Sequence, residues 1–188
     1  GCPRSGYFAG QGYASNKNYK YEQYIRKRED AQRSFIMPNQ KERRNLIEKK
    51  YVIDYDKIKG KDLILVDDSI VRGNTMKMLI KQVRKGEPKS IHIRVASPPL
   101  KAPCHYGIDF PTYTELIGHN KNIEEIRKYI DVESLKYLEI QDIYKAINIE
   151  NPNMCTSCFS NNYKLDMFSP FENVFKNSWK KSNIEYQF

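Results

Sequence analysis

The stretch LILVDDSIVRGNT, Leu63 to Thr75, joins an apolar run to two adjacent aspartates and then to a turn of small residues. The continuous apolar run in KDLILVDD predicts a buried strand. The residues from Asn74 to Lys85 predict an amphipathic helix, whose apolar face carries Met76, Leu79, Ile80 and Val83. Ligands of open α/β sheets bind beyond the carboxyl ends of strands, so Asp67 and Asp68 are candidate ligand-binding residues.

The turn after the two aspartates predicts an anion site. Backbone N–H groups and the helix dipole attract a phosphate at such a helix start, and Gly73 permits a positive φ. Ser69, Asn74 and Thr75 add side-chain donors. A sugar phosphate with magnesium fits carboxylates beside a phosphate turn. A receiver-type phosphoacceptor site and a purely structural acid pair remain alternatives, whereas a Walker A loop is absent.

The rest of the chain alternates strand and helix patterns, which predicts an α/β domain with a mostly parallel sheet. The expected helices are Tyr7–Ser15, Pro38–Glu48, Ile123–Ile130 and Asp142–Ile147, and the further strands are Lys20–Ile25, Ser90–Ser97 and Leu135–Ile140. Arg26 to Ser34 is dense in charge and predicts an exposed loop. The pattern stops after Pro152, so we expect a domain over residues 1–150 and a tail over 151–188.

The net charge is +9, which allows a lysine-rich solvated surface, a polyanion partner or a phosphorylated small substrate. No apolar run approaches the roughly 18 residues of a membrane span, and no signal peptide is visible. We therefore expect a soluble cytoplasmic protein. The chain opens with Gly in mid-motif, which suggests a piece of a longer protein. Its four cysteines are too scattered for a disulfide framework.

LILVDDSIVRGNT resembles the phosphoribosyl pyrophosphate (PRPP) signature of type I phosphoribosyltransferases. Longer stretches are similar to the glutamine PRPP amidotransferase family, namely SFIMPNQKERR (Ser34 to Arg44), IHIRVASPPLKAPCHYGID (Ile91 to Asp109) and TYTELIG (Thr112 to Gly118). The resemblance runs from about Gly1 to Tyr163. It implies a type I phosphoribosyltransferase fold, which is a mostly parallel twisted sheet with flanking helices, here followed by an irregular cysteine-bearing tail.

The resemblance also implies roles for individual residues. Asp67 and Asp68 would handle the ribose hydroxyls and magnesium, and Ser5 would contact the metal or pyrophosphate. The 5-phosphate would be held by the turn, which consists of Ser69, Ile70, Val71, Arg72, Gly73, Asn74 and Thr75. Lys27 and Arg33 would contact pyrophosphate from a flexible flap. The chain departs from the family pattern at Arg4, and in the flap at Glu29, Asp30 and Gln32.

Three cysteines match the ligand positions of family members that carry an iron–sulfur cube. They are Cys104 and the C-x-x-C pair Cys155 and Cys158, and the fourth ligand is expected upstream of this chain. Zinc and ordinary reduced cysteines are the alternatives. Cys2 lies where the family has a small apolar residue, so no ligand role is carried to it, and His92 and His119 have no ligand-like spacing.

The reaction implied by the resemblance is transfer of ammonia, released from glutamine, to PRPP. The products are 5-phosphoribosylamine and pyrophosphate, in the first step of purine nucleotide synthesis. The N-terminal glutaminase domain of the family is absent from this chain. Purine nucleotides as feedback inhibitors and a homo-oligomer are expected, whereas a membrane or nucleic-acid partner is not. The alternatives are a catalytically impaired PRPP-binding regulator and a phosphoribosyltransferase that acts on a base.

Overall fold

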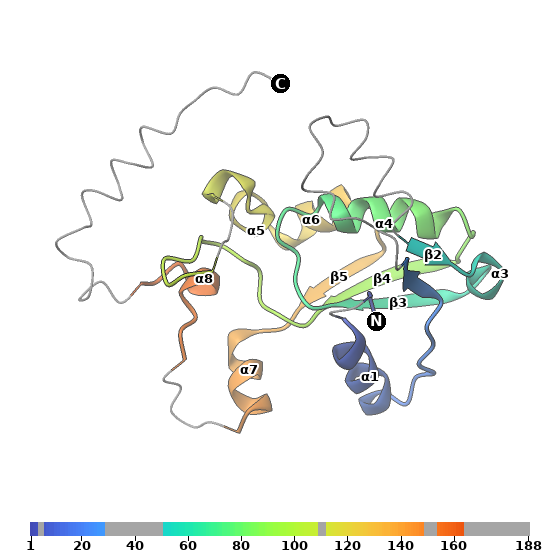
Figure 1. The fold of residues 1–188 in the computed structure, drawn as a ribbon, viewed down its shortest axis with the longest axis horizontal. Helices are drawn as coiled ribbons and strands as arrows, with labels where there is room; N and C mark the ends of the chain where they lie inside the picture. The colour runs from blue at the N-terminus through green and yellow to red at the C-terminus, as the bar shows by residue number, and fades with distance from the viewer. Residues whose placement is uncertain (4–5, 29–50, 109–111, 149–153, 164–188) are drawn as a thin grey trace, which may run out of the picture.

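A three-stranded parallel sheet forms the centre of the molecule (Figure 1). The computed structural model describes residues 1–3, 6–28, 51–108, 112–148 and 154–163. The strands are β3 (Asp62–Asp67), β4 (Ser90–Val95) and β5 (Ser134–Tyr137), in the order β3-β4-β5. Asp67 pairs with Val95, which pairs with Tyr137, so the carboxyl ends of all three strands meet at one edge. The expected parallel α/β sheet is confirmed.

One face of this sheet is apolar and is covered by two helices. The helices α4 (Asn74–Arg84) and α6 (Ile123–Ile130) contact each other and lie on the same side of the sheet (Figure 1). The predicted apolar face of α4 is buried: Met76, Leu79, Ile80 and Val83 are at most 4 % exposed. Helix α1 (Tyr7–Asn16) contacts β3 and lies on the opposite side. Packing from α4 therefore fixes where the turn before it can lie.

Two short strands form a separate antiparallel pair. They are β1 (Ile25–Lys27) and β2 (Tyr51–Ile53), in which Ile25 pairs with Ile53. The predicted strand Lys20–Ile25 is therefore wrong except at its last residue, and Lys27 lies in a strand instead of the predicted loop. The strand is defined by a partner about 25 residues away, which the local pattern does not reveal. The predicted helix Pro38–Glu48 lies outside the described residues.

The remaining boundaries differ by small amounts. The predicted helices at Tyr7 and Ile123 are confirmed, whereas α7 (Ile140–Ala146) begins two residues before the predicted Asp142. Strand β5 consequently ends at Tyr137 rather than at Ile140. Four short helical segments were not predicted: α3 (Tyr55–Ile58), the 3-10 turn η2 (Tyr113–Glu115), α5 (Ile117–Asn120) and α8 (Ser157–Ser160). None of the described helices is both long and apolar enough to cross a lipid bilayer.

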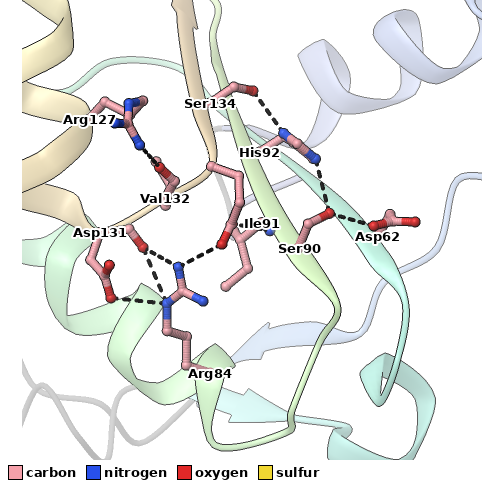
Figure 2. A network of polar contacts seen from close by, with 10 residues as sticks. Asp62, Arg84, Ser90, Ile91, His92, Arg127, Asp131, Val132 and Ser134 are labelled. Atoms are coloured by element: carbon pink, nitrogen blue, oxygen red, sulfur yellow. Dashed lines mark hydrogen bonds and ion pairs between the residues drawn. The ribbon is translucent and has the colours of Figure 1, made fainter.

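Hydrogen bonds tie the amino ends of the strands together, at the edge opposite the two aspartates (Figure 2). The ring of His92 lies between the hydroxyls of Ser134, at 2.8 Å, and Ser90, at 3.0 Å. The Ser90 hydroxyl donates to Asp62 at 2.6 Å. This environment accounts for His92 as a structural residue, as its sequence context suggested.

A second group at that edge is centred on Arg84. Its guanidinium donates to the carbonyl oxygen of Asp131 at 2.6 Å and pairs with the Glu133 carboxylate at 3.2 Å. The same carboxylate accepts the backbone N–H of Ile91 at 2.6 Å. These contacts join α4, α6 and β4 at the amino edge of the sheet, and they do not involve its carboxyl edge.

Candidate active site

The two aspartates lie at the carboxyl end of β3, as predicted. Asp67 is the last residue of the strand and is half-buried, whereas Asp68 is exposed. The backbone N–H of Asp68 donates to the Asp67 carboxylate at 3.0 Å, and the Asp67 carbonyl accepts Ala96 N–H at 2.9 Å. The pair therefore sits at a fixed position on the sheet edge, with oxygens of the kind that magnesium prefers.

Gly73 shapes the turn that follows. Its φ is +77°, in the left-handed region that favours glycine. An added Cβ would lie 2.6 Å from Ile117 Cδ1 and 3.3 Å from Tyr129 Cε1, so a side chain at this position would force the end of the Ile117 side chain to move. Ile70 anchors the other end of the turn and is only 4 % exposed. The predicted need for glycine is confirmed, and close packing adds a second reason for it.

The start of α4 offers backbone donors to a ligand. Gly73 is the N-cap residue, and no side chain caps the helix there. The first helical hydrogen bond runs from Lys77 N–H to Gly73 O at 2.9 Å. The N–H groups of the first turn before Lys77 have no intrahelical acceptors, and they lie at the positive end of the helix dipole. This is the arrangement that binds a phosphate.

The segment that begins at Thr112 contacts the turn through a backbone hydrogen bond and an ion pair. The backbone N–H of Ile117, in α5, donates to Val71 O at 3.0 Å. Arg72 Nε pairs with Glu115 Oε1 at 3.0 Å, and both side chains are nearly half exposed. Arg72 was predicted as a substrate contact, but in this structure its partner is a protein carboxylate. Glu115 lies in the TYTELIG stretch, whose role sequence reasoning left unassigned.

The amino-terminal segment packs beneath the acidic strand end. Cys2 N–H donates to Val66 O at 2.6 Å, and a Cβ on Gly6 would lie 2.2 Å from that same oxygen. Cys2 is 4 % exposed, and burial raises the pKa of its thiol. Cys2 is thus a core residue beside Asp67. Ser5, predicted as a metal or pyrophosphate contact, and Arg4 lie outside the described residues.

Tyr51 also lies in this neighbourhood, although sequence reasoning did not single it out. Burial, followed by the nearby Cys2 and Asp67, raises the pKa of its hydroxyl to about 12. Lys27, one of the two predicted pyrophosphate contacts, is exposed at the end of β1, which pairs with the strand of Tyr51. Arg33 and the rest of the predicted flap lie outside the described residues, so only half of that predicted pair can be located.

The C-x-x-C pair docks against the segment that carries Cys104. The carbonyl oxygen of Cys158, in α8, accepts N–H groups from Lys101 at 2.8 Å and Ala102 at 3.0 Å. Burial first, and then the neighbouring thiols of Cys104 and Cys155, raise the pKa of Cys158. Within the described part of the chain, however, no three His, Cys, Asp or Glu side chains form a group that could hold a metal ion.

Aromatic rings make further contacts within these segments. The Tyr163 hydroxyl donates to Pro103 O, and its ring lies 4.6 Å from that of His105. The His119 ring contacts Lys101 O at 2.9 Å, consistent with the ordinary role expected for it. The cysteine region is therefore assembled by backbone and ring contacts between residues 101–105 and 155–163.

No family model matches the chain. It is 39 % identical over 161 residues to an amidophosphoribosyltransferase of Methanothermobacter thermautotrophicus, which covers 86 % of this chain and 34 % of that protein. It is 36 % identical to a chloroplastic amidophosphoribosyltransferase of Vigna aconitifolia, over 87 % of this chain and 34 % of the relative. The chain thus spans about a third of the length of the curated relatives it matches.

Solved structures agree with these relatives. The fold matches glutamine PRPP amidotransferase from Bacillus subtilis, solved with ADP and GMP, with a TM-score of 0.76 and 34 % identity. That match covers 87 % of this chain and 37 % of the other. A structure described as the allosteric regulatory enzyme of purine biosynthesis matches with the same TM-score at 33 % identity, over 87 % of this chain and 36 % of the other. Over most of its length, this chain is a homologue of the amidophosphoribosyltransferases, the family that its sequence resembles.

Proposed function

We propose that the protein carrying this chain transfers ammonia to C1 of PRPP. The new C1–N bond replaces the C1–O bond to pyrophosphate, and a proton leaves the nitrogen to give 5-phosphoribosylamine, the first intermediate of purine nucleotide synthesis. One observation carries the proposal. An adjacent carboxylate pair, Asp67 and Asp68, precedes a helix start that no side chain caps, in a chain homologous to amidophosphoribosyltransferases.

The turn would bind the 5-phosphate of PRPP through backbone N–H groups, with added donors from Ser69 and Thr75. Asp67 and Asp68 would take the ribose hydroxyls and magnesium, which their carboxylate oxygens suit. Magnesium, when bound, would neutralise charge on the departing pyrophosphate. The turn is held by the hydrogen bond from Ile117 N–H to Val71 O and by close packing around Gly73. It would therefore have its shape before the ligand binds.

Displacement from PRPP needs little proton transfer from the protein, because pyrophosphate is a good leaving group and ammonia a good nucleophile. The work left to the protein is positioning and charge stabilisation. The Asp67 and Asp68 carboxylates would stabilise positive charge that develops on the ribose ring. Lys27 and Arg33 remain the predicted cationic contacts for pyrophosphate.

The three cysteines form a second proposal, a four-iron cluster held by Cys104, Cys155 and Cys158 with a fourth ligand elsewhere. Its support is the docking of the C-x-x-C segment on residues 101–102 and the mutual influence of the three thiols. Because burial favours the neutral thiol of Cys158, ligation would have to displace its proton. Some rearrangement of the side chains would accompany binding, since the described residues hold no ready group of three.

Metal analysis tests this second proposal. Protein purified without oxygen should contain about four iron and four sulfide per chain if the cluster forms. Cys158→Ser should lose most of that iron, whereas Cys2→Ala, which changes a thiol outside the set, should retain it. Zinc in place of iron, or no metal in folded protein, would contradict the cluster.

We also propose that purine nucleotides regulate the enzyme, by analogy with the Bacillus subtilis protein solved with ADP and GMP. We further propose that the protein forms a homo-oligomer and is located in the cytoplasm. Glutamine would supply the ammonia through a separate domain.

The decisive test is an assay of phosphoribosylamine formation by the full-length protein, purified without oxygen. PRPP and magnesium would be supplied once with ammonia and once with glutamine. Ammonia-dependent product that disappears in the Asp67→Asn/Asp68→Asn double variant is the expected result. If the folded protein binds PRPP but forms no product, the proposed enzymatic activity is wrong and a catalytically impaired regulator is favoured.

A further inference from the structure

Tyr129, on α6, contacts the turn Ser69–Thr75, the proposed phosphate turn, although it is distant from it in the sequence. Its hydroxyl donates to Asn74 Oδ1 at 2.7 Å across 55 residues of chain. Its ring packs against the position where Gly73 lacks a side chain, and the Lys77 ammonium lies 4.0 Å from the ring centroid. The ring is therefore held from two sides, which directs the hydroxyl at one atom of the turn.

This hydrogen bond fixes the orientation of the Asn74 amide. An Asn side chain carries one acceptor oxygen and two N–H donors on its nitrogen. Tyr129 uses the oxygen, and among the described residues no hydrogen bond uses the Nδ2 donors. Asn74 is exposed and is the first residue of α4, beside the backbone N–H groups of the turn. Within the part of the chain that the structure describes, its nitrogen thus has no acceptor and could donate to a ligand at the helix start.

We propose that Tyr129 is a positioning residue for the substrate phosphate. It holds the Asn74 amide so that the Nδ2 donors bind the 5-phosphate of PRPP, and it does not contact the substrate itself. This inference rests on the proposed PRPP site, of which Asn74 is already a predicted donor, and adds the residue that orients that donor. An amide with its oxygen released could rotate and present an acceptor to the phosphate, which would weaken binding.

The test is a double-mutant cycle in the full-length protein with Tyr129→Phe, Asn74→Ala and the pair. Tyr129→Phe keeps the ring, and with it the contacts to Gly73 and Lys77, and removes only the hydroxyl. We expect it to raise the PRPP dissociation constant and KM by about 3- to 10-fold, the loss typical of one neutral hydrogen bond, with kcat nearly unchanged. Asn74→Ala should have at least as large an effect.

The cycle separates positioning from general weakening of the fold. In the Asn74→Ala background, Tyr129→Phe should have no further effect on PRPP affinity, because its target amide is gone. Tyr144→Phe, on α7, is the matched control and should leave affinity unchanged. An unchanged dissociation constant in Tyr129→Phe would overturn the inference, and so would a loss that persists undiminished without Asn74.

Calorimetric titration with PRPP and magnesium keeps this inference distinct from the proposed reaction. If wild-type protein binds PRPP but forms no product, the reaction fails while the cycle is still read from dissociation constants. If wild-type protein is active and Tyr129→Phe matches it, only the positioning role fails. If wild-type protein does not bind PRPP, both are wrong.

Discussion

The proposed phosphate turn (Ser69–Thr75) and the cysteine region (residues 101–105 and 155–163) are held in different ways. The turn is fixed by packing at Gly73, by the hydrogen bond from Ile117 to Val71, and by the burial of Ile70. The cysteine region is tied mainly at backbone and ring atoms, and its thiols do not form a ligand group within the described residues. The comparison indicates that the turn would already have its shape before a ligand binds. The thiols, in contrast, would reach their final geometry only when a metal cluster binds.

The largest expected effect comes from placing a methyl group in the turn. Gly73→Ala combines a positive φ with a Cβ 2.6 Å from Ile117 Cδ1. It should lower the free energy of unfolding by about 2–4 kcal/mol and weaken PRPP binding by about 100-fold, through strain and displaced donors. Urea unfolding and calorimetric titration with PRPP measure the two quantities.

Gly60→Ala is the matched control for that variant. Gly60 also has a positive φ, +67°, but no atom lies within 4 Å of an added Cβ. It should therefore cost only the backbone strain, about 1 kcal/mol, and leave PRPP binding unchanged. Equal losses in the two variants would show that packing against Ile117 does not shape the turn.

Thiol reactivity should distinguish the sealed side of the site from the open cysteine region. Cys2 is 4 % exposed and burial raises its thiol pKa, whereas Cys155 is exposed. In metal-free folded protein, iodoacetamide should modify Cys155 at least ~100-fold faster than Cys2, since the buried thiol reacts only after opening. Peptide mass spectrometry follows both, with urea-unfolded protein as the control. Comparable rates in folded protein would mean that the strand end under the turn is not sealed.

A variant at the opposite sheet edge should change stability without touching either region. Burial opposes the charge of Glu133, but the Ile91 N–H and Arg84 outweigh it and lower the pKa of this carboxyl. A lowered folded-state pKa stabilises above the unfolded value of 4.5, and that stability is lost as the pH falls through the folded-state value. Glu133→Gln should therefore cost about 0.5–1 kcal/mol at pH 7, because the partly exposed pair is screened.

Unfolding of the Glu133 variant at several pH values provides the check. The difference from wild-type protein should shrink below pH 4.5, while PRPP affinity at pH 7 stays the same. A stability difference that grows toward low pH would have the wrong sign for a lowered pKa.

The smallest effect concerns Arg72. If its main partner is Glu115, as the 3.0 Å pair indicates, Arg72→Ala should cost about 0.2–1 kcal/mol of stability and change the KM for PRPP by less than about threefold. Glu115→Gln should behave in the same way. A tenfold rise in KM for Arg72→Ala alone would favour the substrate contact that the sequence resemblance implied.

Local sequence patterns predicted the parts of the site that depend on local structure. The apolar run of β3, the position of Asp67 and Asp68 and the amphipathic face of α4 could all be read in this way. The contacts that hold the site could not, because their partners are far apart in the chain. Tyr129 is 55 residues from Asn74, and Glu115 is 43 residues from Arg72.

The same reason explains the misplaced first strand. β1 exists because Ile25 pairs with Ile53, and Tyr51 to Ile53 is too short a run to stand out as a strand. For the cysteines, the family resemblance implied shared ligation, which stays a prediction, and the side-chain geometry would depend on a ligand and on a fourth donor that sequence patterns do not place.

Hydrogen–deuterium exchange of the full-length protein, with and without PRPP and magnesium, tests the central claim most directly. PRPP should slow exchange in peptides that cover Asp68 to Lys77, where backbone N–H groups would bind the 5-phosphate, and leave Thr156 to Ser160 unchanged. Unaltered exchange across Asp68 to Lys77 at saturating PRPP would contradict the assignment of this turn as the phosphate site.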